Sequence, residues 1–274
     1  MNDTLSIAII PLDIAWADVR ENLDRVKRYM SAMHDQGIKP DIAVLPELFS
    51  TGFITDAALL KECCEPIDGP TLDCIRNLSA EYGWAIAGGY AASDCGKFYN
   101  RAFFIKPDGS QVFYDKRHLF SLSAEATVFS PGEGLPPVVD FKGWNISMIV
   151  CYDMRFPVWC RSVRYTYDVM LVPANWPEAR AYAWNTLLSA RAIENQSVYV
   201  GCDRSGCDDY GRYDGLSKIV DAYGVPVGGS CDLGNGMEII IAEVSRKHLE
   251  QCRRRLPTGN DMDDFSVACS AVIS

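Results

Sequence analysis

LSIAII, at residues 5–10, is an apolar run of the length typical of a buried β-strand, and it opens the segment that decides the fold class. Apolar residues then recur from Val19 to Met33 at spacings of three and four, which predicts an amphipathic helix. Gly37 ends this pattern, as a glycine after a helix C-terminus does. IAVL, at residues 42–45, is a second apolar strand. The chain therefore opens as a βαβ unit, which indicates a sheet with helices packed on it.

The alternation of apolar strands and helical segments continues through most of the chain, so we predict an α/β layered fold. Residues 103–106 and 112–114 are the arms of a predicted hairpin around the turn Pro107-Asp108-Gly109. The residues after Leu256 are predicted to form an extended or partly ordered arm, because Pro257-Thr258-Gly259 ends the last helix. Other strands are predicted at 84–88, 145–150, 169–172, 197–201, 217–221, 225–227 and 237–244, and helices at 71–82, 158–165, 181–195 and 245–255.

The composition excludes several classes of protein. With 48% apolar and 23% charged residues, the 274-residue chain is close to the globular average, which argues against a disordered protein. The formal net charge of −10 argues against a nucleic-acid partner, because a nucleic-acid binder needs a basic face. No apolar stretch approaches the roughly 18 residues of a membrane span, and Asp3 stands where a signal peptide would carry Lys or Arg. We therefore expect a cytoplasmic protein with no membrane partner.

Eleven cysteines are the unusual feature of the composition. A reducing cytoplasm disfavours disulfides, and an odd number of cysteines cannot pair completely. There is no CxxC pair and there are only three histidines, so we expect no metal site. Most of the cysteines are interpreted as small buried apolar side chains. Cys151 stands apart because it directly follows the predicted strand at residues 145–150.

Three reactive side chains follow predicted strands: Glu47, Lys116 and Cys151. Ligand sites in open α/β sheets lie beyond the carboxyl ends of strands, so the fold can bring these distant residues together. A carboxylate can take the proton of a thiol, the thiolate can attack a carbonyl or nitrile carbon, and an ammonium can stabilise the resulting oxyanion. Taken singly, each residue has an ordinary structural explanation as an ion-paired, solvated or core side chain. The surrounding sequence is what singles them out.

These three residues lie in segments that resemble the motifs of the nitrilase superfamily of carbon-nitrogen hydrolases. LPELFSTGF at residues 45–53 resembles the glutamate motif of that family, and YDKRHLF at residues 114–120 resembles its lysine motif. VCYDMRFP at residues 150–157 resembles its cysteine motif, and RAIENQ at residues 191–196 matches a further helix–strand signature. The segments follow one another in the family's order across nearly the whole chain.

The resemblance implies a four-layer αββα sandwich, here a single domain over residues 1–256 with a C-terminal extension over 257–274. Such sandwiches usually associate as homodimers. The resemblance also implies Cys151 as nucleophile, Glu47 as general base and Lys116 as oxyanion stabiliser. It implies a small-molecule amide as substrate and requires no metal or organic cofactor.

Family members often carry a second active-site glutamate between the lysine and cysteine motifs. Glu125 and Glu133 are the two candidates in this chain. Glu125 is preferred because residues 121–126 resemble the corresponding loop of the family. Glu133 stands in Pro-Gly-Glu-Gly and is interpreted as a surface turn residue.

Within the superfamily, the segments DKRHLF and CYDMRFPVW are most similar to those of bacterial omega-amidases. This similarity implies hydrolysis of the terminal amide of short 2-oxo acid amides, such as 2-oxoglutaramate and 2-oxosuccinamate, with release of ammonia. N-carbamoyl amine hydrolases, aliphatic amidases and nitrilases use the same triad and remain alternatives. A non-catalytic relative would not need all three reactive residues. A papain-like hydrolase would need a histidine base, and His118, the only histidine near a motif, is interpreted as a loop-fixing hydrogen-bond partner.

An anionic substrate needs a cation outside the triad, and Arg155, four residues past the nucleophile, is the candidate. The alternative is that Arg155 forms a structural ion pair with Asp153 or Glu194. The backbone N–H of Tyr152 is predicted to donate to the oxyanion. Trp176 follows another predicted strand, and it is expected either to wall the pocket or to pack in the core. Weaker candidates for the pocket wall are Phe53 and Tyr90.

Overall fold

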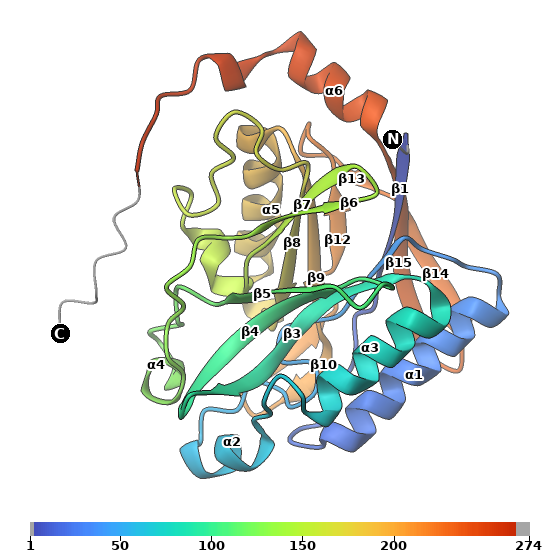
Figure 1. The fold of residues 1–274 in the computed structure, drawn as a ribbon, viewed down its shortest axis with the longest axis vertical. Coiled ribbons are helices and arrows are strands. Elements are labelled where there is room, and N and C mark those ends of the chain that lie inside the picture. Colours follow the sequence, from blue (N-terminus) through green and yellow to red (C-terminus); the bar gives the residue numbers. More distant parts are fainter. Residues whose placement is uncertain (1–2, 267–274) are drawn as a thin grey trace.

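Two large β-sheets lie face to face in the computed structural model of the protein, which describes residues 3–266 (Figure 1). Helices α1 (Val19–Asp35) and α3 (Pro70–Tyr82) cover the outer face of one sheet. Helix α5 (Ala181–Asn195) covers the outer face of the other sheet, where its side chains pack on β9 (Val198–Asp203). This arrangement is the αββα sandwich that the sequence resemblance implied, and the predicted fold class is confirmed.

The first sheet has seven strands in the order β14-β15-β1-β2-β3-β4-β5. Their bounds are Gly229–Gly234 (β14), Met237–Ser245 (β15), Thr4–Ile9 (β1), Ile42–Val44 (β2), Ala85–Asp94 (β3), Lys97–Ile105 (β4) and Gln111–Asp115 (β5). The second sheet has six strands in the order β13-β12-β9-β8-β7-β6. The bounds of its other strands are Pro226–Val227 (β13), Lys218–Val220 (β12), Val169–Ala174 (β8), Trp144–Met148 (β7) and Val138–Phe141 (β6).

A separate two-stranded hairpin pairs β10 (Ser205–Asp208) with β11 (Gly211–Asp214). The other helices are α2 (Ala57–Cys63), α4 (Glu125–Val128) and α6 (Arg246–Arg255), with 3₁₀ turns at η1 (Cys151–Arg155), η2 (Glu178–Arg180) and η3 (Thr258–Asn260). No helix within residues 3–266 has the length and apolar character that crossing a bilayer requires.

Strand β1 explains why the first sheet is covered on both faces. Leu5, Ile7 and Ile9 belong to the core between the two sheets, whereas Ala8 and Ile10 belong to the core beneath α1 and α3. Successive side chains of a strand point to opposite faces, so a strand buried on both sides carries apolar residues on both faces. Each fully buried Leu or Ile contributes about 1.5–3 kcal/mol. The run at the start of the chain therefore determines that the sheet has two covered faces.

The carboxyl ends of parallel strands from the two sheets meet at one edge of the sandwich. Strands β1, β2 and β3 run parallel in the first sheet, and β7, β8 and β9 run parallel in the second. Glu47 follows the end of β2, Cys151 follows β7, and Asn175 directly follows β8. This edge is therefore where the two sheets bring their strand-end residues together.

One predicted element is wrong: residues 158–165 form turns rather than a helix. Arg164 and Tyr165 have φ of 51° and 62°, in the left-handed region that a right-handed helix excludes. Side chains hold the segment in place instead, because the Trp159 indole N–H donates to the Tyr114 hydroxyl at 2.7 Å. The hairpin β10–β11 and strand β14 were not predicted.

The described part of the predicted C-terminal extension contacts the sandwich at η3 and beyond it, where Arg164 pairs with Asp264 at 3.0 Å. The Gly259 N–H donates to the Tyr165 hydroxyl at 2.8 Å, and the Thr258 hydroxyl donates to Oε1 of Gln196 at 2.9 Å. Residues 267–274 of the extension lie outside the described residues.

Candidate active site

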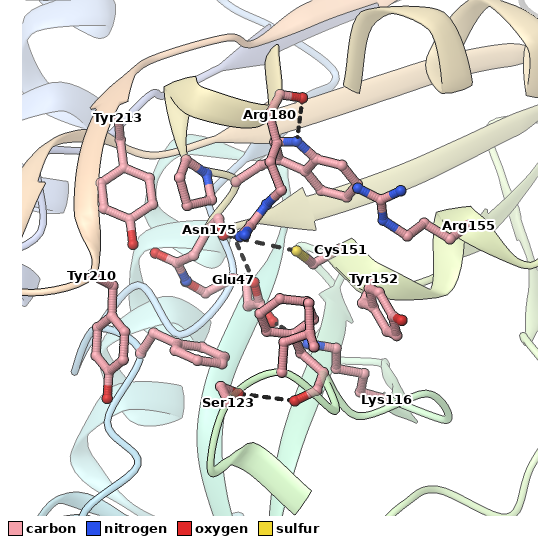
Figure 2. A pocket seen from close by; sticks show the side chains of 15 residues that line it. Glu47, Lys116, Ser123, Cys151, Tyr152, Arg155, Asn175, Arg180, Tyr210 and Tyr213 are labelled. Atoms are coloured by element: carbon pink, nitrogen blue, oxygen red, sulfur yellow. Dashed lines mark hydrogen bonds and ion pairs between the residues drawn. The ribbon is translucent and has the colours of Figure 1, made fainter. Parts of the chain in front are cut away.

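A pocket of about 260 Å³ opens at the edge where the strands of the two sheets end (Figure 2). Glu47, Lys116 and Cys151, which belong to three distant sequence motifs, all line it. Their exposed fractions are 0%, 1% and 8%. The structure therefore brings the three predicted residues together in one nearly water-free cluster.

The ammonium of Lys116 lies between two carboxylates. Its Nζ donates to Oε1 of Glu47 at 2.9 Å, and to Oε1 and Oε2 of Glu125 at 2.9 and 3.1 Å. Burial by itself lowers the pKa of Lys116, but the charges of Glu125 and Glu47 outweigh it and hold this pKa well above its usual 10.5. Lys116 is therefore a fixed positive charge at the base of the pocket.

Of the two candidates for a second glutamate, Glu125 belongs to this cluster and Glu133 does not. Glu125 is fully buried at the start of α4, whereas Glu133 is exposed. Besides its bonds to Lys116, Glu125 accepts from Nδ2 of Asn100 at 2.9 Å and from the backbone N–H of Phe120 at 2.6 Å. Three residues thus donate hydrogen bonds to its carboxylate.

Donors from both sheets orient Glu47. Asn100, on β4, donates from Nδ2 to Oε1 of Glu47 at 2.7 Å, and the Asn175 N–H donates to Oε2 at 2.8 Å. The chain at Glu47 packs tightly against β3, where a Cβ on Gly89 would lie 3.2 Å from the Glu47 Cα. Glycine at this position permits the close approach of the two backbones.

The two asparagines were missed in the sequence. Asn175 directly follows an apolar strand, and Glu47 and Cys151 stand three residues past the ends of theirs, so its position after a strand could have singled it out too. Asn100 lies in the middle of β4, and nothing in its sequence neighbourhood distinguishes it from other strand residues.

Cys151 stands at the start of η1 with φ of 45°, a left-handed conformation that costs a non-glycine residue free energy and makes a sharp turn after β7. Its Sγ lies 3.9 Å from the carbonyl oxygen of Asn175. Burial and, after it, the charge of Glu47 raise the pKa of the Cys151 thiol well above its usual value, and Lys116 offsets only part of this. The resting group is therefore a neutral thiol. Within residues 3–266, the neighbouring N–H of Tyr152 donates to no protein acceptor.

Asp153 ties the lysine motif to the cysteine motif. The backbone N–H of His118 donates to its Oδ1 at 2.9 Å, and Nδ1 of the same histidine lies 2.7 Å from that oxygen. Oδ2 accepts from the Tyr114 hydroxyl at 2.8 Å and from the Val150 N–H at 3.2 Å. His118 also stacks on Phe156 with ring centroids 3.7 Å apart. This geometry agrees with the interpretation of His118 as a loop-fixing partner.

The walls of the pocket contain the predicted substrate-binding residues. The guanidinium of Arg155 lies 4.7 Å from the centroid of the Trp176 ring and 6.0 Å from that of Tyr152, and all three residues line the pocket. Arg155 forms no ion pair with Asp153 or with Glu194, which pairs with Arg191.

Of the weaker wall candidates, Phe53 lines the pocket, whereas Tyr90 packs in the core under α1 and α3. Sequence reasoning missed Arg180 and the hairpin residues Tyr210 and Tyr213, which also line the pocket. The hairpin was not predicted, so nothing indicated that its tyrosines would reach the site.

The remaining cysteines show a mixed environment. Cys160 and Cys202 are buried, as interpreted from the sequence, but Cys95 and Cys207 are exposed. All the cysteines in the described part of the chain are free thiols. In that same part, no group of three or more His, Cys, Asp or Glu side chains is placed to hold a metal ion.

Comparisons with known proteins place this site in a family. Residues 6–254 match the family model described as carbon-nitrogen hydrolase. The omega-amidase YafV of Yersinia enterocolitica is 38% identical over 263 residues, which cover 96% of this chain and 98% of that protein. The 2-oxoglutaramate amidase of Bacillus subtilis (strain 168) is 28% identical over 260 residues, which cover 94% of this chain and 97% of that protein.

Among solved structures, XC1258 from Xanthomonas campestris is similar over 98% of this chain and 100% of its own, with a TM-score of 0.87 and 33% identity. It is described as a CN-hydrolase superfamily protein with an arsenic adduct in the active site. The resemblance seen in the three sequence motifs is thus confirmed at the level of the whole chain, which belongs to the carbon-nitrogen hydrolase family.

Proposed function

We propose that the protein is an omega-amidase that hydrolyses the terminal amide of short 2-oxo acid amides, such as 2-oxoglutaramate and 2-oxosuccinamate. The observation that carries the proposal is the buried cluster in which Lys116 bridges Glu47 and Glu125, in the pocket that also holds Cys151. The names of two relatives that align over nearly the full chain, an omega-amidase and a 2-oxoglutaramate amidase, support this substrate class.

In the first half of the proposed reaction, the Cys151 sulfur attacks the amide carbon while Glu47 takes the thiol proton. A base is needed because the raised pKa of Cys151 keeps the thiol protonated at rest. The carbonyl electron pair moves to oxygen, where Lys116 and the Tyr152 N–H stabilise the negative charge. The C–N bond then breaks, the nitrogen takes the proton from Glu47, and ammonia leaves a thioester on Cys151.

In the second half, Glu47 removes a proton from water as the water oxygen attacks the thioester carbon. The C–S bond breaks, the acid departs, and the Cys151 sulfur takes back the proton that Glu47 holds. Glu125 accepts two hydrogen bonds from Lys116, so we assign it to holding the ammonium in place during both halves. Proton transfer by a positioned side chain, here Glu47, contributes about 10²–10⁴-fold to the rate.

We assign Arg155 to the carboxylate of the substrate. The chain carries a net charge of −10, so attraction of an anion has to come from a local cation. Arg155 lines the pocket, and its guanidinium is held over the Trp176 ring without an ion-pair partner among residues 3–266. A guanidinium can bind a carboxylate through two parallel hydrogen bonds. Trp176 and Tyr152 then form the pocket wall that contacts the substrate.

The proposed function is tested by ammonia release from a panel of substrates. The panel holds 2-oxoglutaramate, 2-oxosuccinamate, glutamine, N-carbamoylputrescine and a simple aliphatic nitrile, each offered to the wild-type protein and to Cys151→Ala. We expect turnover of the two 2-oxo acid amides and none by the variant. Activity only on the carbamoyl amine, or only on the nitrile, would assign the protein to another branch of the family.

We also propose that the enzyme works in the cytoplasm as a homodimer. The free thiols of the described residues support a reducing compartment. Tyr182 and Ile193 on α5 expose 84% and 53% of their surface, which supports an apolar contact between copies along this helix. Light scattering coupled to size-exclusion chromatography tests the dimer, and a Tyr182→Glu, Ile193→Glu variant is expected to run as a monomer.

A further inference from the structure

Arg180 is a second arginine of the pocket, placed by an element far from Arg155 in the chain. Arg155 is the last residue of η1 and Arg180 is the last residue of η2, and both line the cavity that holds the nucleophile (Figure 2). The guanidinium of Arg180 lies 5.0 Å from the centroid of the Phe120 ring, at the exposed side of the pocket. We propose that Arg155 and Arg180 form a two-arginine clamp for the substrate carboxylate, and that Arg180 makes the enzyme specific for anionic amides.

Both arginines are free to bind a ligand. Neither forms an ion pair or a side-chain hydrogen bond with any other residue from 3 to 266. Two buried arginines outside the pocket do have such partners: Arg101 pairs with Asp115 at 2.6 Å, and Arg204 pairs with Asp208 at 2.7 Å. Carboxylates thus neutralise these buried guanidinium groups, whereas the half-buried Arg155 and the exposed Arg180 have no such partner among residues 3–266.

Trp176 connects the two arms of the clamp. Its indole N–H donates to the carbonyl of Arg180 at 2.9 Å, which fixes the backbone from which that side chain extends. The Arg155 guanidinium lies over the Trp176 ring, 4.7 Å from the ring centroid. Because Trp176 is only 3% exposed, its position is set by the core, and it holds both arginines relative to one another. Such preorganisation lowers the entropy that binding a small anion costs.

The charges of the site match an amide with one carboxylate. Lys116 balances one of the two buried glutamates, so with a neutral Cys151 thiol the inner cluster has one net negative charge. Arg155 and Arg180 bring the whole pocket to one net positive charge, which a monoanionic substrate neutralises. A neutral amide leaves the arginines without a partner. Hydrolysis adds a second carboxylate at the end of the product that faces Glu47. The repulsion between this new carboxylate and that of Glu47 favours release of the product.

The clamp rests on the proposed function, and the test compares two substrates of the same length. These are 2-oxoglutaramate and its neutral methyl ester, with ammonia release measured for the wild type and for Arg180→Gln, Arg180→Lys and Arg155→Gln. Arg254→Gln is the matched control, because Arg254 pairs with Glu250 on the surface of α6, outside the pocket lining. Arg180 is exposed, so its substitution leaves the core intact.

We expect Arg180→Gln to raise KM for 2-oxoglutaramate by about 10- to 100-fold, as expected for loss of a charge-assisted hydrogen bond, with little change in kcat. Its kcat/KM for the methyl ester is expected to stay close to that of the wild type. Arg180→Lys should raise KM for 2-oxoglutaramate less than Arg180→Gln does, because lysine keeps the positive charge but lacks the planar guanidinium that makes two parallel hydrogen bonds.

Equal effects of Arg180→Gln on both substrates, or an unchanged KM for 2-oxoglutaramate, would overturn the clamp while the wild-type activity upholds the proposed function. A wild type that hydrolyses neither 2-oxo acid amide of the panel would overturn the proposed function, and the clamp with it.

Discussion

Asn175 holds Glu47 at both ends: its backbone N–H donates to Oε2 of Glu47 at 2.8 Å, and its Nδ2 donates to the Glu47 backbone carbonyl at 2.7 Å. Glu47 follows a strand of the first sheet and Asn175 follows a strand of the second. The orientation of the proposed base therefore depends on how the two sheets pack on each other. The carbonyl of Asn175 also faces the Cys151 sulfur, so this one residue contacts both the proposed base and the proposed nucleophile.

Asn175→Ala is expected to lower kcat by about 10- to 100-fold with a smaller change in KM, because it releases the Glu47 backbone and misplaces the base. Steady-state ammonia release measures the split between kcat and KM. Asn145→Ala is the control, since Asn145 is an exposed residue of β7. A larger effect on KM than on kcat would mean that Asn175 acts on substrate binding instead.

Glu47→Gln is expected to lower the pKa of Cys151 and at the same time to lower kcat by about 10²–10⁴-fold. In the wild type the negative charge of Glu47 disfavours the thiolate, so a neutral amide in its place lets the thiol ionise at lower pH. Thiolate absorbance measured against pH reports the shift. An unchanged or higher thiol pKa in the variant would contradict the electrostatic coupling of the two residues, and Glu133→Gln, at an exposed position, should leave both quantities unchanged.

Glu125→Gln is expected to move the alkaline limb of the kcat/KM profile to lower pH. Glu125 and Glu47 together raise the pKa of Lys116 well above 10.5, and the ammonium form is the one that stabilises an oxyanion. With one carboxylate removed, the pKa of Lys116 falls and activity is lost earlier as the pH rises. A profile whose alkaline limb does not move would show that Glu125 does not set the charge of Lys116.

Asp153→Asn is expected to destabilise the protein by about 1–3 kcal/mol, because Asp153 accepts from four donors while buried and an asparagine cannot accept all of them. Urea unfolding monitored by fluorescence measures the loss. His118→Ala removes one of these donors and should cost less, and His34→Ala, at an exposed position of α1, should be neutral. If His118→Ala is as damaging as Asp153→Asn, the histidine carries more than a loop contact.

The order of most strands and helices was readable from the sequence because it depends on local apolar spacing. The stripe from Val19 to Met33 predicted α1, and the pattern over residues 181–195 predicted α5. The segment at residues 158–165 was misread because its turns depend on partners distant in the chain, such as the bond from Trp159 to the Tyr114 hydroxyl. Local spacing carries no information about such a partner.

The sequence by itself determined the family and pointed to Glu47, Lys116 and Cys151, because each lies within three residues of the end of a strand, inside a distinctive motif. Only the tertiary structure decided which of the two glutamates approaches Lys116, and that Asn100 and Asn175 orient the base. It also placed Arg180 in the same pocket as Arg155. The physical reason is that these relationships cross between strands and between sheets, so they arise from how the sheets pack and not from the spacing of residues along the chain.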